Sequence, residues 1–121
     1  LFSGLFLSSI VSADIHPMFT PKVDVAFPDS VSIRYRQPVA MRDGVTLSTH
    51  TYLPAAEGKF PTLLVRDIYG NGSQPVRQRY ARWATANGYA FVYQVARGRY
   101  DSEGEWYPYF QEINDGEDTL T

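Results

Sequence analysis

The sequence contains no cysteine, and this absence removes three kinds of chemistry at once. Disulfides, zinc sites built on thiolates and a cysteine nucleophile are all excluded. Histidine is scarce as well, because only His16 and His50 are present and they are too scattered to indicate a metal cluster. No metal and no organic cofactor is therefore expected.

An excess of charge of either sign is also lacking. The 121 residues carry 11 basic and 13 acidic side chains, a formal net charge of −2, and contain no basic block. Nucleic acid and anionic membrane surfaces are therefore not favoured as partners. Hydrophobic residues make up 44% and aromatic residues 15% of the chain, which is enough to build the core of one small domain rather than a disordered segment.

The amino end holds an apolar stretch, residues 1–11, that leads into Val-Ser-Ala at positions 11–13. This pattern is typical of the apolar region and cleavage site of a secretory signal peptide, and it is shorter than the roughly 20 apolar residues of a spanning helix. We expect residues 1–13 to be a signal peptide with a truncated amino end. Secretion or a periplasmic location would follow, without stable membrane insertion. Residues 14–30 contain three prolines and are expected to form an extended lead-in.

Apolar and polar residues alternate from Val31 to Tyr35 and again beyond Pro38. A period of two predicts a half-buried strand, and the proline indicates an edge position. Asp43-Gly44 is a turn dipeptide of tight hairpins, after which a strand would return over residues 45–53. An antiparallel hairpin is therefore predicted.

Two continuous apolar runs follow, Thr62–Val65 and Ala90–Tyr93, of the kind found in strands that are covered on both faces. A helix is predicted between them, because Ser73 can cap it, Pro75 suits its first turn and Gly88 suits its end. Its buried face is expected to consist of Val76, Tyr80, Trp83 and Ala84.

Strand, crossover helix and strand form a βαβ unit with parallel strands, and the acidic run 114–118 predicts a further helix. The fold class is therefore α/β: an amino-terminal antiparallel hairpin plus the first βαβ unit of a mostly parallel sheet. Such a sheet needs more strands and helices to cover both faces. We expect residues 31–121 to be the amino-terminal part of an incomplete domain.

A polar loop follows each of the two buried strands. Tyr69 lies in the first loop, and residues 97–106, Arg-Gly-Arg-Tyr-Asp-Ser-Glu-Gly-Glu-Trp, form the second. In open parallel sheets, ligands bind beyond the carboxyl ends of the strands. Both loops are therefore expected to line one rim, where a site would lie.

Four segments in this order carry a resemblance to a known family: residues 39–45, residues 64–70 with Tyr69-Gly70, residues 87–90, and residues 97–104. Together they resemble the amino-terminal part of the Xaa-Pro dipeptidyl-peptidase-like hydrolases, the group that includes cocaine esterase and the α-amino-acid ester hydrolases. The resemblance covers roughly residues 31–121. It implies an α/β-hydrolase fold and a Ser-Asp-His triad that acts on esters, or on peptides with proline second from the amino end.

The triad itself is not found in this chain. No serine lies in a Gly-x-Ser-x-Gly elbow, and no late aspartate and histidine follow, in keeping with the late position of these residues in α/β-hydrolases. The fragment is therefore expected to be inactive.

One functional residue is implied by the resemblance. Tyr69 matches a tyrosine that donates its hydroxyl to the oxyanion hole, and α/β-hydrolases draw an oxyanion donor from this loop. The alternative is a surface or packing tyrosine, since nine are present. The chain also departs from the family at residues 95–96, where Val-Ala replaces a usual acidic residue and removes a possible anchor for the following loop.

Other patterns allow rival interpretations. Gly70-Asn71-Gly72 resembles a dinucleotide-binding loop, but the third glycine is missing and no acidic residue ends the next strand at Gln94. Asn71-Gly72-Ser73 is also a glycosylation sequon. A non-catalytic exported binding protein on the same scaffold is the alternative function, because fold alone does not establish activity.

The remaining polar and aromatic residues have both structural and functional interpretations. We expect the charged residues of the second loop to brace that loop rather than bind substrate, and His50 to be a structural or an exposed histidine. The acidic group near the end is expected to be a solvated helix start rather than a metal site. The segment Trp106–Phe110 either walls an acyl pocket or covers the sheet. The charged loop residues considered for these two roles are Arg97, Asp101, Glu103 and Glu105, and the acidic group is Glu112, Asp115, Glu117 and Asp118.

Overall fold

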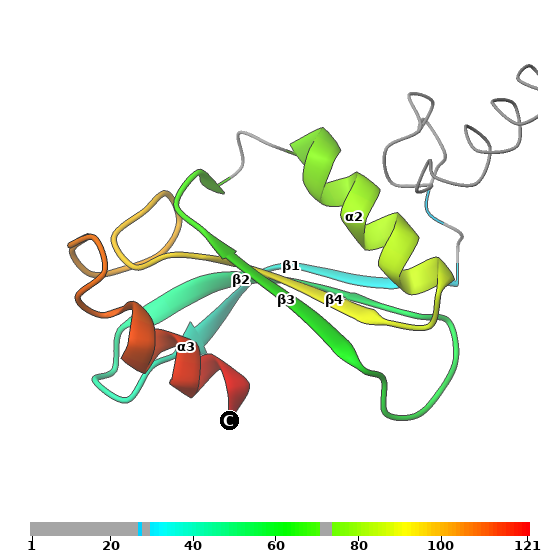
Figure 1. The fold of residues 1–121 in the computed structure, drawn as a ribbon, viewed down its shortest axis with the longest axis horizontal. Helices are drawn as coiled ribbons and strands as arrows, with labels where there is room; N and C mark the ends of the chain where they lie inside the picture. Colours follow the sequence, from blue (N-terminus) through cyan, green and yellow to red (C-terminus); the bar gives the residue numbers. More distant parts are fainter. Residues whose placement is uncertain (1–26, 28–29, 71–73) are drawn as a thin grey trace, which may run out of the picture.

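The computed structural model describes residues 27, 30–70 and 74–121. Four strands form one sheet in the order β1-β2-β4-β3 (Figure 1). The strands are β1 (Ser32–Ala40), β2 (Thr46–Leu53), β3 (Thr62–Asp67) and β4 (Ala90–Val95), and the helices are α2 (Gln74–Ala86) and α3 (Glu112–Leu120). The predicted α/β class is confirmed. The export segment, the sequon and most of the lead-in lie outside the described residues.

β1 and β2 form the predicted antiparallel hairpin, with Val39 opposite Leu47. Gly44 adopts a φ of 85° in the turn, a conformation that glycine accepts without steric cost. The proline-containing strand β1 is at the edge of the sheet. Proline is tolerated there because an edge strand need not donate every backbone N–H to a neighbour.

β3, α2 and β4 form the predicted βαβ unit, and Leu64 lies opposite Val92 in the parallel pair. The helix ends as expected at Gly88, whose φ is 80°. The N–H of Tyr89 donates to the carbonyl of Ala84 (2.9 Å), and the N–H of Gly88 donates to Thr85 (3.3 Å). These two bonds are those of a Schellman motif, so glycine at this position satisfies carbonyl groups that the helix end leaves open.

The alternation of side chains along the strands divides the sheet into two faces. Tyr52, Phe91 and Tyr93 pack with Ala81 and Ala84 in the core beneath α2. Arg66, Gln94 and Thr119 lie on the other side, where Arg66 Nε and Thr119 Oγ1 donate to Gln94 Oε1 at 2.8 and 2.9 Å. Accordingly, α2 and α3 lie on opposite faces of the sheet (Figure 1).

One expectation about burial is wrong. Val76 is 45% exposed, whereas Arg77, Ala81 and Ala84 are buried, because the two alanines let the helix approach the sheet closely and thereby set its rotation. Leu63 and Val65 of β3 are 36% and 37% exposed. In the described part of the chain β3 is an edge strand, which leaves one side without a neighbour.

His50 is buried in the core, which favours the structural over the exposed alternative. It is 2% exposed, and its ring lies 5.7 Å from that of Tyr35 and 6.0 Å from that of Tyr93. Neither ring nitrogen has a hydrogen-bond partner among the described residues. Burial lowers the pKa of His50 to about 4, and the positive charges of Arg77 and Arg36 act in the same direction against the weaker effect of Asp101.

This buried imidazole predicts a loss of stability in mild acid. The pKa of His50 is depressed in the folded state, so between pH 6.5 and 4 the unfolded chain binds a proton that the folded chain does not. The free energy of unfolding should fall by up to roughly 3 kcal/mol over this range. His50→Phe, which keeps an aromatic ring, should reduce that dependence. Thermal unfolding of the wild-type protein that contains this chain and of its His50→Phe variant, measured from pH 7 to 4, tests this prediction. An equal loss of stability with falling pH in both proteins would contradict it.

Candidate functional site

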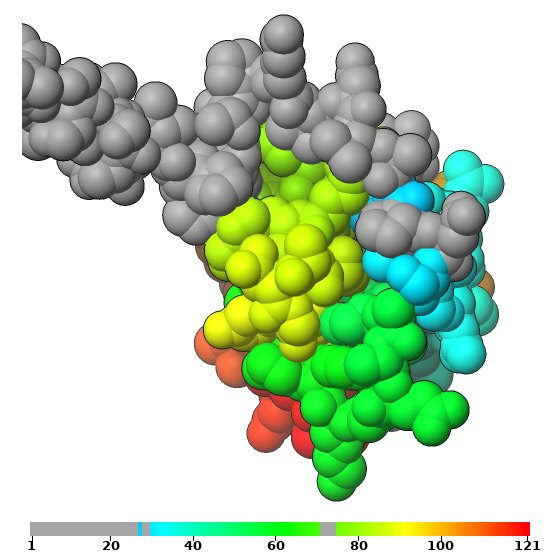
Figure 2. All heavy atoms as spheres, turned by 90° about the vertical axis from the view of Figure 1, so that its right-hand side faces the viewer, coloured from blue at the N-terminus to red at the C-terminus, as the bar shows by residue number. Residues whose placement is uncertain are grey.

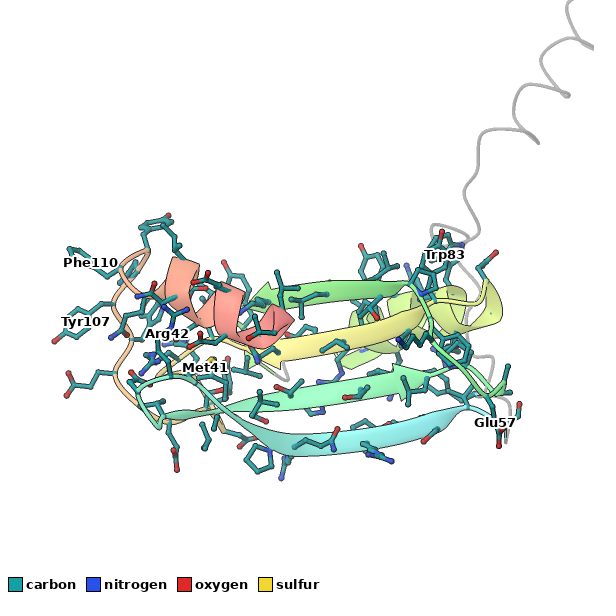
Figure 3. The ribbon with its side chains drawn as sticks, turned by 90° about the horizontal axis from the view of Figure 1, so that it is seen from below. Met41, Arg42, Glu57, Trp83, Tyr107 and Phe110 are labelled. Atoms are coloured by element: carbon teal, nitrogen blue, oxygen red, sulfur yellow. The ribbon has the colours of Figure 1, made fainter. Side chains whose placement is uncertain are left out.

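The two ends of the sheet carry different kinds of residues. One end has the loop between β2 and β3 beside the end of α2 (Figure 2), and Trp83 stacks there on Tyr89 with ring centroids 6.4 Å apart. The hairpin turn with Arg42 and the loop that carries Tyr107 lie at the opposite end (Figure 3). The carboxyl ends of β3 and β4 point to this second end, so the candidate site is sought there.

The loops after β3 and β4 lie side by side, as predicted, and we call residues 67–70 and 96–110 the carboxyl-end rim. Arg99 Nε donates to the carbonyl oxygen of Ile68 at 3.1 Å. The ring of Tyr100 packs so closely on Gly70 that a Cβ at Gly70 would lie 2.2 Å from it. The φ of Gly70 is 58°. Glycine therefore allows both the turn and the contact with the second loop.

Tyr69 projects from this rim and is 66% exposed. Its backbone is not free, because its N–H donates to Asp67 Oδ1 at 2.9 Å. The exposure rules out a packing role among the described residues, and leaves a surface tyrosine or an oxyanion donor.

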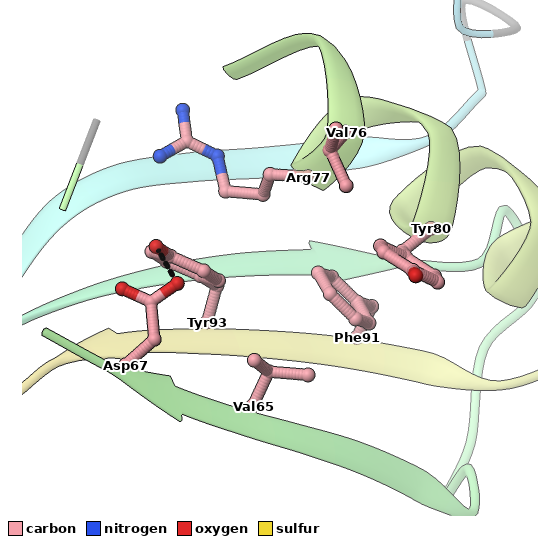
Figure 4. Close-up of a pocket in the computed structure, with 7 residues that line it drawn as sticks. All are labelled: Val65, Asp67, Val76, Arg77, Tyr80, Phe91 and Tyr93. Atoms are coloured by element: carbon pink, nitrogen blue, oxygen red, sulfur yellow. Dashed lines mark hydrogen bonds between the residues drawn. The ribbon is translucent and has the colours of Figure 1, made fainter. Parts of the chain in front are cut away.

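Asp67 and Tyr93 hold the turn that carries Tyr69, and the sequence analysis did not single out either residue. Asp67 Oδ1 also accepts the N–H of Gly70 at 3.1 Å. The hydroxyl of Tyr93 reaches both Asp67 Oδ2 (Figure 4) and the carbonyl oxygen of Gly70, the latter at 2.7 Å. A signal was present in the sequence, because a carboxylate that ends an apolar strand in a parallel sheet falls at the ligand-binding edge.

A pocket of about 250 Å³ lies between α2 and the strands β3 and β4 (Figure 4). Its polar residues are Asp67, Arg77 and Tyr93, and its apolar residues are Val65, Val76, Tyr80 and Phe91. The guanidinium of Arg77 lies 5.2 Å from the ring centre of Tyr93. The pocket therefore shares Asp67 and Tyr93 with the turn of Tyr69.

Arg97 braces the rim, as predicted for this residue. It is 5% exposed, and its guanidinium donates to Asp115 at 2.6 and 3.0 Å and to Asp43 at 2.7 and 3.1 Å. One side chain thereby connects the loop after β4 with the hairpin turn and with α3. The hydrogen bonds from Arg97 hold the pKa of Asp43 below its usual value.

Glu103 braces the second loop from its other end. Its Oε2 atom accepts the N–H of Thr46 at 3.0 Å, and this backbone hydrogen bond lowers the pKa of Glu103. The N–H of Gly98 donates to the carbonyl of Glu103 at 2.8 Å. A Cβ at Gly98 would lie 2.3 Å from the backbone nitrogen of Trp106. The loop is thus folded back on itself, and only glycine fits at its first turn.

Asp101 and Glu105, the other two residues expected to brace the loop, make more exposed contacts. Asp101 pairs with Arg36 at 3.2 Å, and Glu105 accepts the hydroxyl of Tyr107 at 3.3 Å. These contacts also lie within or beside the loop, so the bracing interpretation holds for the four charged residues.

A serine of the following loop anchors the segment Val95-Ala96, where the resemblance implied a departure from the family pattern. Ser102 Oγ donates to the carbonyl of Val95 at 2.8 Å and accepts the N–H of Ser48 at 2.9 Å. A hydroxyl in the loop therefore ties the end of β4 to β2, and the departure from the family pattern leaves the fold intact.

The expectation that the acidic group near the end of the chain is a solvated helix start is wrong for Asp115, whereas the side chain of Glu117 is 65% exposed. Asp115 is 1% exposed and is paired with Arg97. Arg66 pairs with Glu112 at 2.8 Å, and Arg42 pairs with both Glu117 and Asp118 at 2.6 Å. The three arginines come from separate strands and turns far from α3 in the sequence, so local sequence could not reveal them. α3 itself begins at Glu112, before the acidic run that predicted it.

The aromatic segment does not cover the sheet. Tyr109 and Phe110 are 88% and 86% exposed, and the side chains of Tyr107 and Phe110 point away from the strands (Figure 3). The guanidinium of Arg99 lies over the ring of Trp106, 4.9 Å from the centre of that ring. A role as the wall of an acyl pocket stays a prediction.

Two further observations concern the described residues alone. They contain no group of three or more histidine, cysteine, aspartate or glutamate side chains that could hold a metal ion. Neither described helix combines the length and the apolar character that crossing a bilayer requires.

Solved structures share this fold. An α-amino acid ester hydrolase is 26% identical with a TM-score of 0.63, over 89% of this chain and 21% of its own. An aminopeptidase from a marine sediment Thaumarchaeota archaeon is 28% identical with a TM-score of 0.61, over 89% of this chain and 20% of its own. A CocE/NonD family hydrolase from Staphylococcus aureus, 19% identical, has a TM-score of 0.64 over 88% of this chain and 26% of its own. The chain therefore has part of an α/β-hydrolase fold.

Sequence comparison identifies the family within this fold class. The sequence profile of the X-Pro dipeptidyl-peptidase (S15) family matches residues 43–121, and the chain belongs to this family of hydrolases. The cocaine esterase of Rhodococcus sp. (strain MB1 Bresler) is 40% identical over 91 residues. That match covers 69% of this chain and 15% of the esterase, so the chain spans a small part of its relative's length.

The buried pair between Arg97 and Asp115 predicts a strong effect of a small change. Asp115→Asn keeps the side-chain shape but leaves the buried guanidinium without one of its two carboxylates, at a cost of about 2–4 kcal/mol. We expect faster amide hydrogen exchange throughout α3 and the loop after β4. Glu117→Gln is the matched control, because it neutralises an exposed member of the same helix and such pairs contribute little. Equal exchange in both variants would contradict the role of Asp115.

Proposed function

We propose that this chain is the amino-terminal part of an exported serine hydrolase that cleaves acyl bonds, with Tyr69 as a donor to its oxyanion hole. The family supports the hydrolase class, and its similar proteins include a cocaine esterase and an α-amino acid ester hydrolase. The substrates would be esters, or peptides with proline second from the amino end.

The chemistry would be that of an acyl-enzyme. A serine attacks the carbonyl carbon, a histidine removes the serine proton, and an aspartate orients the histidine. In this proposal these three residues lie in parts of the protein beyond this chain. The hydroxyl of Tyr69 then donates to the carbonyl oxygen as it gains negative charge, a contribution of about 3 kcal/mol for comparable donors.

One observation carries the proposal. Tyr69 is exposed at the carboxyl end of β3, on a turn whose backbone is tied to Asp67. A donor to an oxyanion must be accessible to substrate and yet held in place, since its benefit depends on fixed geometry before the reaction begins. Tyr69 meets both requirements.

Export is the second element of the proposal and depends on residues 1–13. The apolar stretch and the small residues at positions 11–13 support cleavage after Ala13. Amino-terminal sequencing of the protein recovered from the secreted or periplasmic fraction tests this, with Asp14 as the expected first residue. A cytoplasmic protein that retains residues 1–13 would overturn it.

A binding protein without catalysis is the second candidate, and the exposed aromatic pair Tyr109 and Phe110 is what favours it. The coding sequence downstream of Thr121 separates the two functions. A Gly-x-Ser-x-Gly elbow after α3 supports the hydrolase, and its absence supports the binding protein.

Loss of the Tyr69 hydroxyl should slow the reaction in the full-length protein. We expect Tyr69→Phe to lower kcat on an ester substrate by at least about tenfold, because the hydroxyl acts on charge that forms in the transition state. Tyr89→Phe is the control, since it removes a hydroxyl at the opposite end of the sheet. An unchanged kcat in Tyr69→Phe would remove Tyr69 from the mechanism.

The 121-residue chain on its own should not hydrolyse esters or Xaa-Pro peptides. It contains no serine in a Gly-x-Ser-x-Gly elbow, so the serine nucleophile of the proposed mechanism is not part of this chain. Turnover by the purified chain, measured against a buffer blank with a chromogenic ester, would contradict the proposed division of the active site.

A further inference from the structure

We propose that Asp67 and Tyr93 are positioning residues that hold the turn of Tyr69 in the orientation required for catalysis. This inference rests on the proposed oxyanion role of Tyr69. It goes further because it assigns a task to two residues that would act through Tyr69.

The carboxylate of Asp67 holds the backbone on both sides of Tyr69. One oxygen, Oδ1, accepts two successive backbone N–H groups, those of Tyr69 at 2.9 Å and Gly70 at 3.1 Å. These bonds fix the peptide planes on both sides of the Tyr69 Cα atom. The direction of the Cα–Cβ bond of Tyr69 is therefore set by Asp67, although the phenol ring itself is exposed.

Asp67 is itself held by the neighbouring strand β4. Asp67 is the last residue of β3 and lies opposite Val95 in the parallel pair. Its other oxygen, Oδ2, accepts a hydrogen bond from the hydroxyl of Tyr93. Tyr93 is 3% exposed on the central strand β4, so the carboxylate is anchored to the best-supported part of the sheet.

Hydrogen bonds to two carbonyl oxygens, those of Gly70 and Ile68, also hold the turn. The hydroxyl of Tyr93 also lies 2.7 Å from the carbonyl oxygen of Gly70, and Arg99 Nε donates to the carbonyl of Ile68. Ile68 is thus held through its carbonyl group by Arg99, and Gly70 through its carbonyl group by the Tyr93 hydroxyl, which shares its one proton between this oxygen and Asp67 Oδ2. The N–H of Tyr69 is held by Asp67. Each of these hydrogen bonds leads to a buried or bridging side chain, whereas the phenol of Tyr69 itself is exposed.

Such an arrangement matters for rate rather than for substrate binding. A hydrogen bond to a developing oxyanion depends steeply on the donor's position, and small displacements cost large factors in kcat. If the ties loosen, the phenol samples more orientations and the transition state loses part of its stabilisation. The ground state makes little use of the same bond, so KM should change little.

The test uses the full-length enzyme, a p-nitrophenyl ester and active-site titration, so that kcat refers to correctly folded sites. We expect Tyr93→Phe and Asp67→Ala each to lower kcat about five- to tenfold with less than about a twofold change in KM. Tyr89→Phe is the matched control, because it removes a tyrosine hydroxyl at the opposite end of the sheet, away from these hydrogen bonds. It should keep the wild-type kcat.

Asp67→Asn separates positioning from charge. The amide oxygen still accepts the two backbone N–H groups, and the amide nitrogen donates to the hydroxyl of Tyr93, which then donates to Gly70. We therefore expect Asp67→Asn to keep at least about half of the wild-type kcat. A kcat as low as that of Asp67→Ala would overturn the positioning role, and this pair of variants keeps the test decisive where Tyr93→Phe fails to fold.

A double mutant shows whether Tyr93 acts through Tyr69. In the Tyr69→Phe background, Tyr93→Phe should lower kcat by less than about twofold further, because the group that it positions is already gone. If the two losses multiply, Tyr93 acts elsewhere and the inference is overturned. If Tyr69→Phe slows the reaction but Tyr93→Phe does not, this inference alone fails. If Tyr69→Phe keeps the wild-type rate, the proposed role of Tyr69 fails first.

Discussion

The guanidinium of Arg97 lies where the hairpin turn, the loop after β4 and α3 meet, and the shape of the rim depends on its two carboxylate partners. Asp43 belongs to the hairpin turn and Asp115 to α3, so one cation connects parts of the chain that are 54 and 18 residues away from it. A buried guanidinium is costly unless its donors are satisfied. The three segments must therefore come together for the charge to be accommodated, which makes their arrangement mutually dependent.

Charge and hydrogen bonding are distributed differently on the two faces of the sheet. Beneath α3, arginines reach the acidic residues of the helix and the amide of Gln94, so this helix is held by polar contacts. Beneath α2, alanines and aromatic rings pack against the strands, and the polar groups of Tyr93 and Asp67 appear at the carboxyl end. The turn of Tyr69 emerges from this second face. The carboxylate of Asp67 thereby connects the apolar layer beneath α2 with the turn that carries the exposed phenol of Tyr69.

Much of the fold could be predicted because its signals are local. Asp43-Gly44 predicted the hairpin turn, Pro38 the edge strand, and Gly88 the end of α2, since each depends on backbone preferences of a few residues. The parallel pairing of β3 and β4 followed from the length of the crossover. The rotation of α2 was predicted wrongly, because the pattern of large apolar residues suggested Val76 inside, whereas Ala81 and Ala84 determine how closely the helix packs. Asp115 was misjudged for a related reason: its burial depends on Arg97, whose approach no local pattern encodes.

The sequence by itself determined the family, the order of the elements and the position of Tyr69 after the first buried strand, because these are recorded in short motifs and in periodicity. Only the tertiary structure decided which side chains meet. The contact of Asp67 with Tyr93 joins neighbouring strands separated by a whole helix, and the ties of Arg97 join a turn to a helix. Such contacts arise from strand register and helix docking, which are properties of the assembled sheet and not of any segment alone.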